Sequence, residues 1–145
     1  MALSYKKRGR LALFRREKIM LKIKPIEKKE DQRAICASCS VTYNADYFAY
    51  SAYEDDKLLG ICQFGMRDGK GHVYNIAPAD GTDDFDALFL LGRAALNFID
   101  LCGVHEAYYE GEESSLTLAV GFKKNAEGKF YVNLEGFFVD PCQHK

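Results

Sequence analysis

The sequence predicts an α/β (α+β) protein in which a mixed, mostly antiparallel sheet is flanked by helices. Short runs that alternate apolar and polar residues recur along the chain and are bounded by turn-forming residues, as strands are. Segments with apolar residues at helical spacing lie between these runs, so strands and helices are mixed along the chain. With 145 residues, 48% of them hydrophobic, the chain is long enough for one domain with its own core.

The first half of the domain is predicted to contain a strand, a helix and three further strands. The sequence LKIKPI at 21–26 alternates apolar and basic residues, and Pro25 restricts this strand to an edge or an end. A helix follows from Glu27, because acidic residues come early and apolar residues recur at helical spacing. Three strands are expected at 47–53, 58–66 and 72–76, separated by the turn-forming sequences EDDK and RDGKG.

The second half begins with a long apolar helix, expected from about Asp83 to Cys102. Thr82 or Asp83 can cap its start, and Gly103 suits the position after its end.

A strand is expected in HEAYYEG at 105–111, followed by a short helix in ESSLTLAVG that Gly121 ends. A closing hairpin turns at NAEG and places Phe130, Val132 and Leu134 on one face.

Residues 1–19 form a basic N-terminal extension, with seven basic residues and one acidic residue. The remainder, residues 20–145, has 13 basic and 20 acidic residues and is expected to be the single domain. A basic arm can bind nucleic acid or an acidic surface, but this one lacks interleaved aromatic residues and a recognition helix. We therefore expect a solvated extension and no nucleic-acid partner; Met20 is an alternative natural start.

The chain has no run of about 20 apolar residues, so no membrane span is expected and a cytoplasmic location is favoured. Its five cysteines are an odd set with irregular spacing, which favours free thiols. Neither they nor the histidines have the spacing of metal ligands, so we expect no metal and assign the histidines no role. These residues are Cys36, Cys39, Cys62, Cys102, Cys142, His72, His105 and His144.

The order of the expected elements resembles that of the GNAT superfamily of acyl-CoA-dependent N-acyltransferases. The spacing between VYNIAP (73–78) and AVGF (119–122) is similar as well. In SLTLAVGF, Leu116, Gly121 and Phe122 stand where members commonly have a leucine and a Gly-Phe pair. The ending YVNLEGFFVDPC also resembles a subset of bacterial members. The resemblance covers Leu21 to about Phe138 and implies a divergent bacterial member with the GNAT fold.

The resemblance implies that acetyl-CoA binds where the fourth and fifth strands separate, with its pyrophosphate on the N-terminus of the next helix. The residues that would line this site are Ile76, Pro78, Gly81, Thr82, Asp84 and Asp86. The family's phosphate-binding motif has Arg or Gln, then Gly, then Gly or Ala, and counting from Pro78 these positions hold Gly81, Asp84 and Asp86.

Carboxylates in this loop add bulk and repel phosphate, so we expect acetyl-CoA to bind weakly or not at all. The same aspartates also stabilise a helix start, which is a sufficient reason for them to be there. A cation or a basic ligand at this loop is a further alternative, although no ligand pattern supports a metal.

The resemblance also identifies positions that carry chemistry in the family. The tyrosine that can protonate the departing thiolate is replaced by Thr117, which cannot act as an acid near neutral pH. The asparagine that often follows the fifth strand falls near Glu110. Tyr109 and Glu110 are therefore the candidate acid and base, and the alternative is that both are solvent-facing residues at a strand end.

Two functions remain open from the sequence. One is a GNAT-like N-acetyltransferase with a degenerate pyrophosphate loop and doubtful activity, and the other is a non-catalytic binding or assembly module on the same fold. The partner is a small molecule or a protein, a homodimer being one possibility. Four tyrosines before and within the second strand can line a pocket for a flat or cationic ligand, or they pack the strand. They are Tyr43, Tyr47, Tyr50 and Tyr53.

Overall fold

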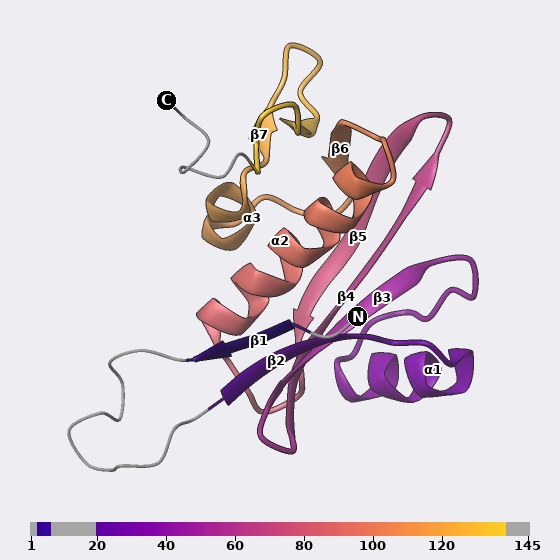
Figure 1. Ribbon diagram of the computed structural model, residues 1–145, viewed down its shortest axis with the longest axis vertical. Coiled ribbons are helices and arrows are strands. Elements are labelled where there is room, and N and C mark those ends of the chain that lie inside the picture. Colours follow the sequence, from indigo (N-terminus) through magenta and orange to yellow (C-terminus); the bar gives the residue numbers. More distant parts are fainter. Residues whose placement is uncertain (1–2, 7–19, 139–145) are drawn as a thin grey trace, which may run out of the picture.

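A computed structural model describes residues 3–6, as backbone, and residues 20–138 (Figure 1). These residues form one eight-stranded sheet in the order β1-β2-β3-β4-β5-β6-β8-β7. The strands are β1 (Leu3–Lys6), β2 (Met20–Pro25), β3 (Phe48–Glu54), β4 (Lys57–Arg67), β5 (Lys70–Pro78), β6 (Glu106–Tyr109), β7 (Lys123–Lys124) and β8 (Phe130–Asn133). The helices are α1 (Lys29–Ser38), α2 (Phe85–Leu101) and α3 (Ser115–Val120).

The predicted fold class is confirmed, because every pair of neighbouring strands is antiparallel except β5 and β6. One strand was not predicted: β1, within the basic extension, pairs with Met20–Ile23 of β2. The other residues of that extension, together with Cys142 and His144, lie outside the described residues.

Helices α2 and α3 lie on one face of the sheet (Figure 1). The apolar side of α2 supplies buried leucine, alanine and isoleucine side chains to the main core. Gly92 brings α2 close to α3, since a Cβ atom there would lie 2.8 Å from Cγ2 of Val120. Arg93 donates from Nε to the carbonyl oxygen of Val120 at 2.7 Å, which satisfies a free carbonyl at the end of α3.

Helix α1 lies on the opposite face and buries a smaller apolar cluster against β3, β4 and the end of β5. Beneath it, Gln32 donates from Nε2 to Oε1 of the buried Gln63 at 2.9 Å. Cys36 and Cys39 pack in this cluster, and burial raises the pKa of the Cys39 thiol to about 11. The expectation of free thiols is confirmed for the four cysteines of the described part of the chain.

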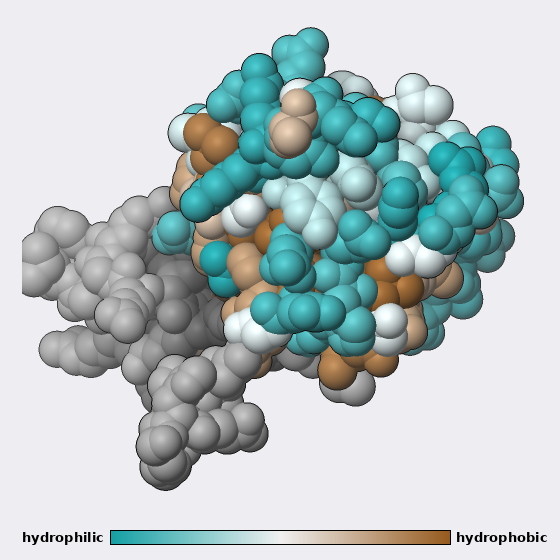
Figure 2. Space-filling view, turned by 90° about the horizontal axis from the view of Figure 1, so that it is seen from above, coloured by the Kyte–Doolittle hydropathy of each residue, from teal (hydrophilic) through white to brown (hydrophobic). Residues whose placement is uncertain are grey.

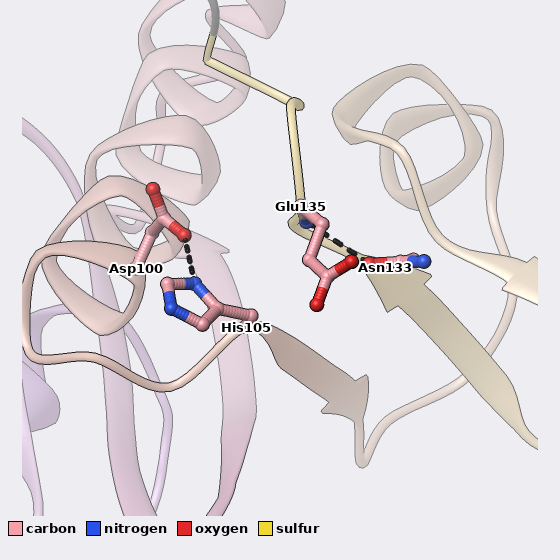
Figure 3. Close-up of polar contacts among 4 residues, drawn as sticks. All are labelled: Asp100, His105, Asn133 and Glu135. Carbon is pink, nitrogen blue, oxygen red and sulfur yellow. Dashed lines mark hydrogen bonds and ion pairs between the residues drawn. The ribbon is translucent and has the colours of Figure 1, made fainter.

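The turn between α2 and β6 is held by a contact that the sequence did not suggest (Figure 3). Nδ1 of His105 lies 2.7 Å from Oδ1 of Asp100, in the last turn of α2. His105 therefore helps to position β6. On the neighbouring strand β8, the side chain of Asn133 accepts the backbone N–H of Glu135 at 2.9 Å and shapes the turn that ends the strand.

Strands β5 and β6 run side by side only briefly. Their parallel pairing joins Gly71, His72 and Val73 to Ala107, Tyr108 and Tyr109, and it ends with the N–H of Glu110 donating to the carbonyl oxygen of Val73. Beyond that point β5 continues to Pro78 with β4 as its sheet partner. The two strands therefore separate, as the GNAT resemblance implied.

The close approach of β4 to β5 and α2 gives a test of the packing. A Cβ atom at Gly60 would lie 2.6 Å from the carbonyl oxygen of Ala77 and 2.8 Å from Leu88, so Gly60→Ala forces the backbone to shift. We expect urea denaturation to show a loss of about 1–3 kcal/mol in the free energy of unfolding.

Gly65→Ala, on the same strand, is the matched control for that variant. Its Cβ atom would meet the Tyr74 ring at 3.7 Å, an ordinary contact. Equal destabilisation by the two substitutions would contradict the packing described here.

Candidate functional site

A cavity of about 460 Å³ lies at the carboxyl end of β6, next to the point where β5 and β6 separate. Its walls come from the start of β5, the end of β6 and the turn before β8, and they include His72, Tyr108, Glu110 and Lys129. The end of the molecule that carries β7 and the β4–β5 turn is mainly hydrophilic, with small separate hydrophobic areas (Figure 2). The cavity volume is in the range of small-molecule sites, roughly 300–1,000 Å³.

The closest polar contact in this cavity joins His72 to Glu110. Nδ1 of His72 lies 2.6 Å from Oε2 of Glu110, and the side chains are 16% and 43% exposed. An ionised carboxylate only accepts hydrogen bonds, so beside one Nδ1 is the donor, and in the neutral imidazole Nε2 then holds the lone pair. The pair is therefore arranged to accept a proton at Nε2, as a general base does.

Sequence reasoning named Glu110 as a candidate but gave His72 no role. The only indication in the sequence was the alternation of the strand, which placed His72 on the side of β5 opposite the buried Val73. The parallel register of β5 with β6 brings His72 to Glu110, and that pairing joins residues 38 positions apart.

Tyr109 and Glu110 both line this cavity, but the ring of Tyr109 packs toward the α2 side of the sheet. Its ring packs against Phe122, with ring centroids 5.5 Å apart. Burial raises the pKa of the Tyr109 phenol, Cys62 adds to the rise, and a hydrogen bond from the backbone amide of Ile76 opposes it. The phenol thus stays protonated near neutral pH and engages the backbone of β5 beyond the point of separation.

The N-terminus of α2 is capped by Asp84, and neither Thr82 nor Asp83 has that position. Oδ1 of Asp84 accepts the N–H of Ala87 at 3.1 Å, so one amide that a free helix start offers to an anion is already used. The hydroxyl of Thr82 donates to the carbonyl oxygens of Ala79 and Leu59. It therefore closes the turn that precedes the helix.

The other candidate cofactor residues lie around this turn. Ile76 is buried with its side chain toward Gly92, and the exposed Pro78 ends β5. Gly81 has φ +83°, a conformation that glycine adopts without strain, and Asp86 is exposed in the first helical turn. The hydroxyl of Thr82 and the carboxylate of Asp84 thus hold this turn and the helix start.

Thr117, which stands in the place of the family's tyrosine, is buried and belongs to a capping box. Its hydroxyl accepts the N–H of Ser114 at 3.0 Å, and Oγ of Ser114 accepts the N–H of Thr117 at 3.2 Å. The residue therefore stabilises the start of α3.

The four tyrosines of the N-terminal half do not line one pocket. The guanidinium of Arg33 lies over the ring of Tyr43, and the ammonium of Lys24 lies over the ring of Tyr53. Tyr50 packs against Phe64 in the core. Tyr47 stacks on Tyr74 of β5, with centroids 3.7 Å apart. Each ring thus contacts a different neighbour. This agrees with the alternative in which the tyrosines pack the strands, and not with a shared ligand pocket.

Residues 20–138 contain no group of three or more histidine, cysteine, aspartate or glutamate side chains placed to hold a metal ion. In the same part of the chain, no helix combines the length and apolar character that crossing a bilayer requires.

Comparison with solved structures identifies the fold. The chain is similar to the ribosomal-protein-S18-alanine N-acetyltransferase of Escherichia coli, with a TM-score of 0.60, 12% identity, and coverage of 79% of this chain and 94% of the enzyme. An acetyltransferase of the GNAT family from Streptococcus pneumoniae gives a TM-score of 0.55 and 18% identity, covering 72% and 88%. The protein has the GNAT fold. A Bacillus subtilis acetyltransferase solved in complex with CoA has the same likeness, with a TM-score of 0.59, 16% identity, and coverage of 77% and 99%.

The sequence itself matches no protein-family model and no curated protein. Every likeness described above lies below 20% identity and therefore shows the GNAT fold alone.

The cap on α2 can be tested by stability alone. Asp84→Ala removes the acceptor for the N–H of Ala87 and should lower the free energy of unfolding by about 1 kcal/mol. Asp84→Asn keeps an acceptor and should lose less, while Asp83→Ala, at an exposed position before the cap, should change little. Chemical denaturation of the three variants measures this order, and an effect of Asp83→Ala as large as that of Asp84→Ala would contradict it.

Proposed function

We propose that this protein is a binding module on the GNAT fold, in which the site for acetyl-CoA is degenerate and N-acetyltransferase activity is weak or absent. The observation that carries the proposal is the position of Asp84. Its carboxylate caps α2, at the helix N-terminus on which the family resemblance places the pyrophosphate.

Charge repulsion opposes a pyrophosphate at this helix start. Two unit charges 4 Å apart repel by roughly 1 kcal/mol in water and about 4 kcal/mol at an effective dielectric constant of 20. Asp83, Asp84 and Asp86 all lie within or just before the first turn, so a pyrophosphate there meets several such repulsions. It also competes with the cap for the N–H of Ala87.

Tyr109 supports the same proposal from the other end of the expected cofactor site. Its phenol is hydrogen-bonded to the backbone of Ile76, on the part of β5 that has separated from β6. The ring thus lies in the opening between the strands. The buried Thr117, engaged in its capping box, has neither the acidity nor the freedom to protonate a thiolate.

The cavity beside β6 is where a small ligand would bind. Its lining includes the His72–Glu110 pair, the aromatic residues Tyr108 and Phe130, and the charged residues Lys70, Glu127 and Lys129. A polar ligand with a flat or apolar part suits these walls, because convergent polar groups fix orientation while rings supply contact area.

Ligand binding tests the proposal directly. Millimolar acetyl-CoA should raise the melting temperature little, because stabilisation follows RT ln(1 + [L]/Kd) and weak binding keeps that quantity small. The triple variant Gly81→Arg, Asp84→Gly, Asp86→Gly should bind CoA more tightly by calorimetry and should melt at a lower temperature, since the cap is lost and glycine enters the first turn. Clear stabilisation of the unmodified protein by micromolar acetyl-CoA would overturn the proposal.

The His72–Glu110 pair favours a second candidate, an acyltransferase that holds CoA in another way. A carboxylate-bound imidazole with a free Nε2 can deprotonate an amine, and a general base typically contributes about 10²–10⁴-fold in rate.

If the protein transfers acetyl groups, His72→Ala should lower kcat/KM by at least about 10²-fold in an assay with acetyl-CoA and a panel of amines. His105→Ala is the matched control, because His105 is also paired with a carboxylate but lies at the α2–β6 turn. Equal activity of the two variants would remove His72 from the chemistry, and no transfer by the unmodified protein would exclude this second candidate.

A further inference from the structure

A second cavity, lined largely by aromatic rings, lies where β2 ends at Pro25 and the chain passes on to α1 (Figure 1). Its volume is about 330 Å³, within the range of small-molecule sites. Its walls come from the end of β2, from β3 and β4, and from the C-terminal half of α2. This aromatic cavity shares no lining residue with the cavity beside β6, so the two are separate sites.

Four rings line the aromatic cavity and contact one another: Phe48 and Tyr50 of β3, Phe64 of β4 and Phe98 of α2. The ring centroid of Phe64 lies 5.9 Å from that of Phe48, 5.6 Å from that of Tyr50 and 5.5 Å from that of Phe98. Tyr50 is parallel to Phe64 within 11°, whereas Phe98 crosses Phe64 at 68°. Rings of different orientation thus surround one space, and aromatic molecules pack well on such rings, either offset-stacked or edge to face.

The floor of this cavity is buried, but one of its walls is open to water. Phe64 is 1% exposed and Tyr50 is 9% exposed, whereas Phe48 is 47% exposed. Phe98 is half-buried. An apolar occupant would remove part of the Phe48 ring from water, and that burial favours binding.

Polar groups at the rim are engaged within the chain. The ammonium group of Lys29 donates to the carbonyl oxygen of Tyr47 at 2.6 Å and to Oε1 of Gln32 at 3.2 Å. The N–H of Ile26 donates to the carbonyl oxygen of Ala49 at 2.9 Å.

The charged residues of the rim are of both signs. Lys29 is a cation, and Glu27, which is exposed, is an anion. Since a charged ligand would be attracted by one of these residues and repelled by the other, the rim favours an uncharged occupant.

An extended peptide fits this cavity poorly. Pro25 has no N–H to donate. Tyr50 is paired with Pro25 on one side and with Cys62 on the other, so the floor offers a peptide no strand edge. A peptide inserted between the four rings would bury its own amides without partners, which is unfavourable.

We propose that the aromatic cavity is a binding site for a small uncharged aromatic molecule of one or two fused rings. An apolar cavity of roughly 150 Å³ is enough to bind benzene, so a cavity of about 330 Å³ has room for such a molecule. The four rings supply the contact area, and the paired rim leaves polar ligands without partners. This site does not depend on whether the protein binds CoA.

Toluene is a suitable probe, titrated into the full chain and followed by NMR of the aromatic side chains and by thermal melts. We expect saturable binding of one molecule per chain, with shifts concentrated in the four rings. Nuclear Overhauser contacts should join the toluene methyl group to Tyr50, Phe64 and Phe98. The melting temperature should rise with toluene concentration, because the ligand binds the folded state.

Two matched substitutions distinguish this cavity from exposed rings in general. Phe48→Ser removes the exposed wall and should raise the toluene Kd at least about tenfold. Phe85→Ser is the control, because Phe85 is also 47% exposed but lies at the other end of α2 from Phe98, and it should leave the Kd unchanged. Thermal melts without toluene confirm that both variants fold.

Two results would overturn the proposal. The first is the absence of saturable binding, or binding that both substitutions weaken equally, since toluene would then only adhere to exposed rings. The second is self-association, measured by sedimentation velocity, that Phe48→Ser abolishes while toluene does not bind, because a second copy of the chain would then cover the cavity.

Discussion

The short parallel pairing of β5 with β6 is the constraint on which the rest of this structure depends. Antiparallel neighbours can be joined by tight turns, but a parallel pair needs a long crossover, and here that crossover contains α2. Pairing three residues of each strand fixes where the strands separate. It also fixes which side chains meet there: His72 with Glu110 on one face, and Tyr109 with the backbone of Ile76 on the other.

The start of α2 shows how one set of residues can favour folding and oppose a ligand at once. Carboxylates at a helix N-terminus satisfy free amides and interact favourably with the helix dipole, each contributing roughly 0.3–1 kcal/mol. The same amides and the same dipole are what a phosphate would use. In this chain the carboxylate of Asp84 accepts one of those amide N–H groups, so an anion could bind that amide only by displacing the cap that stabilises the helix start.

The two faces of the sheet have different roles because their helices differ in length. The 17-residue α2, together with α3, covers the main core, whereas the 10-residue α1 covers β3, β4 and only the end of β5. The remaining surface carries tyrosines and one histidine, whose rings shield the sheet while their polar atoms stay near water. This surface borders the cavity at β6, with His72 and Tyr108 belonging to both.

The sequence by itself determined the order of nearly all elements, the mixed sheet and the apolar side of α2, because strand alternation and helical spacing are local properties of the chain. It also placed aspartates at the start of α2, although which of them caps the helix depended on the exact turn, and Asp84 rather than Asp83 has that position. The strand in residues 3–6 could not be predicted, since a four-residue strand gains its stability from β2 and not from its own pattern.

Only the tertiary structure decided what the candidate residues contact. Glu110 was identified as a candidate from the sequence, but its partner His72 lies on another strand, and a register between distant strands leaves no local signal. Tyr109 follows the alternation of β6, so its ring packs on Phe122 of the main core, while Glu110 pairs with His72 on the other face. Sequence patterns specify which residues share a face within one strand, whereas contacts between strands depend on packing of the whole sheet.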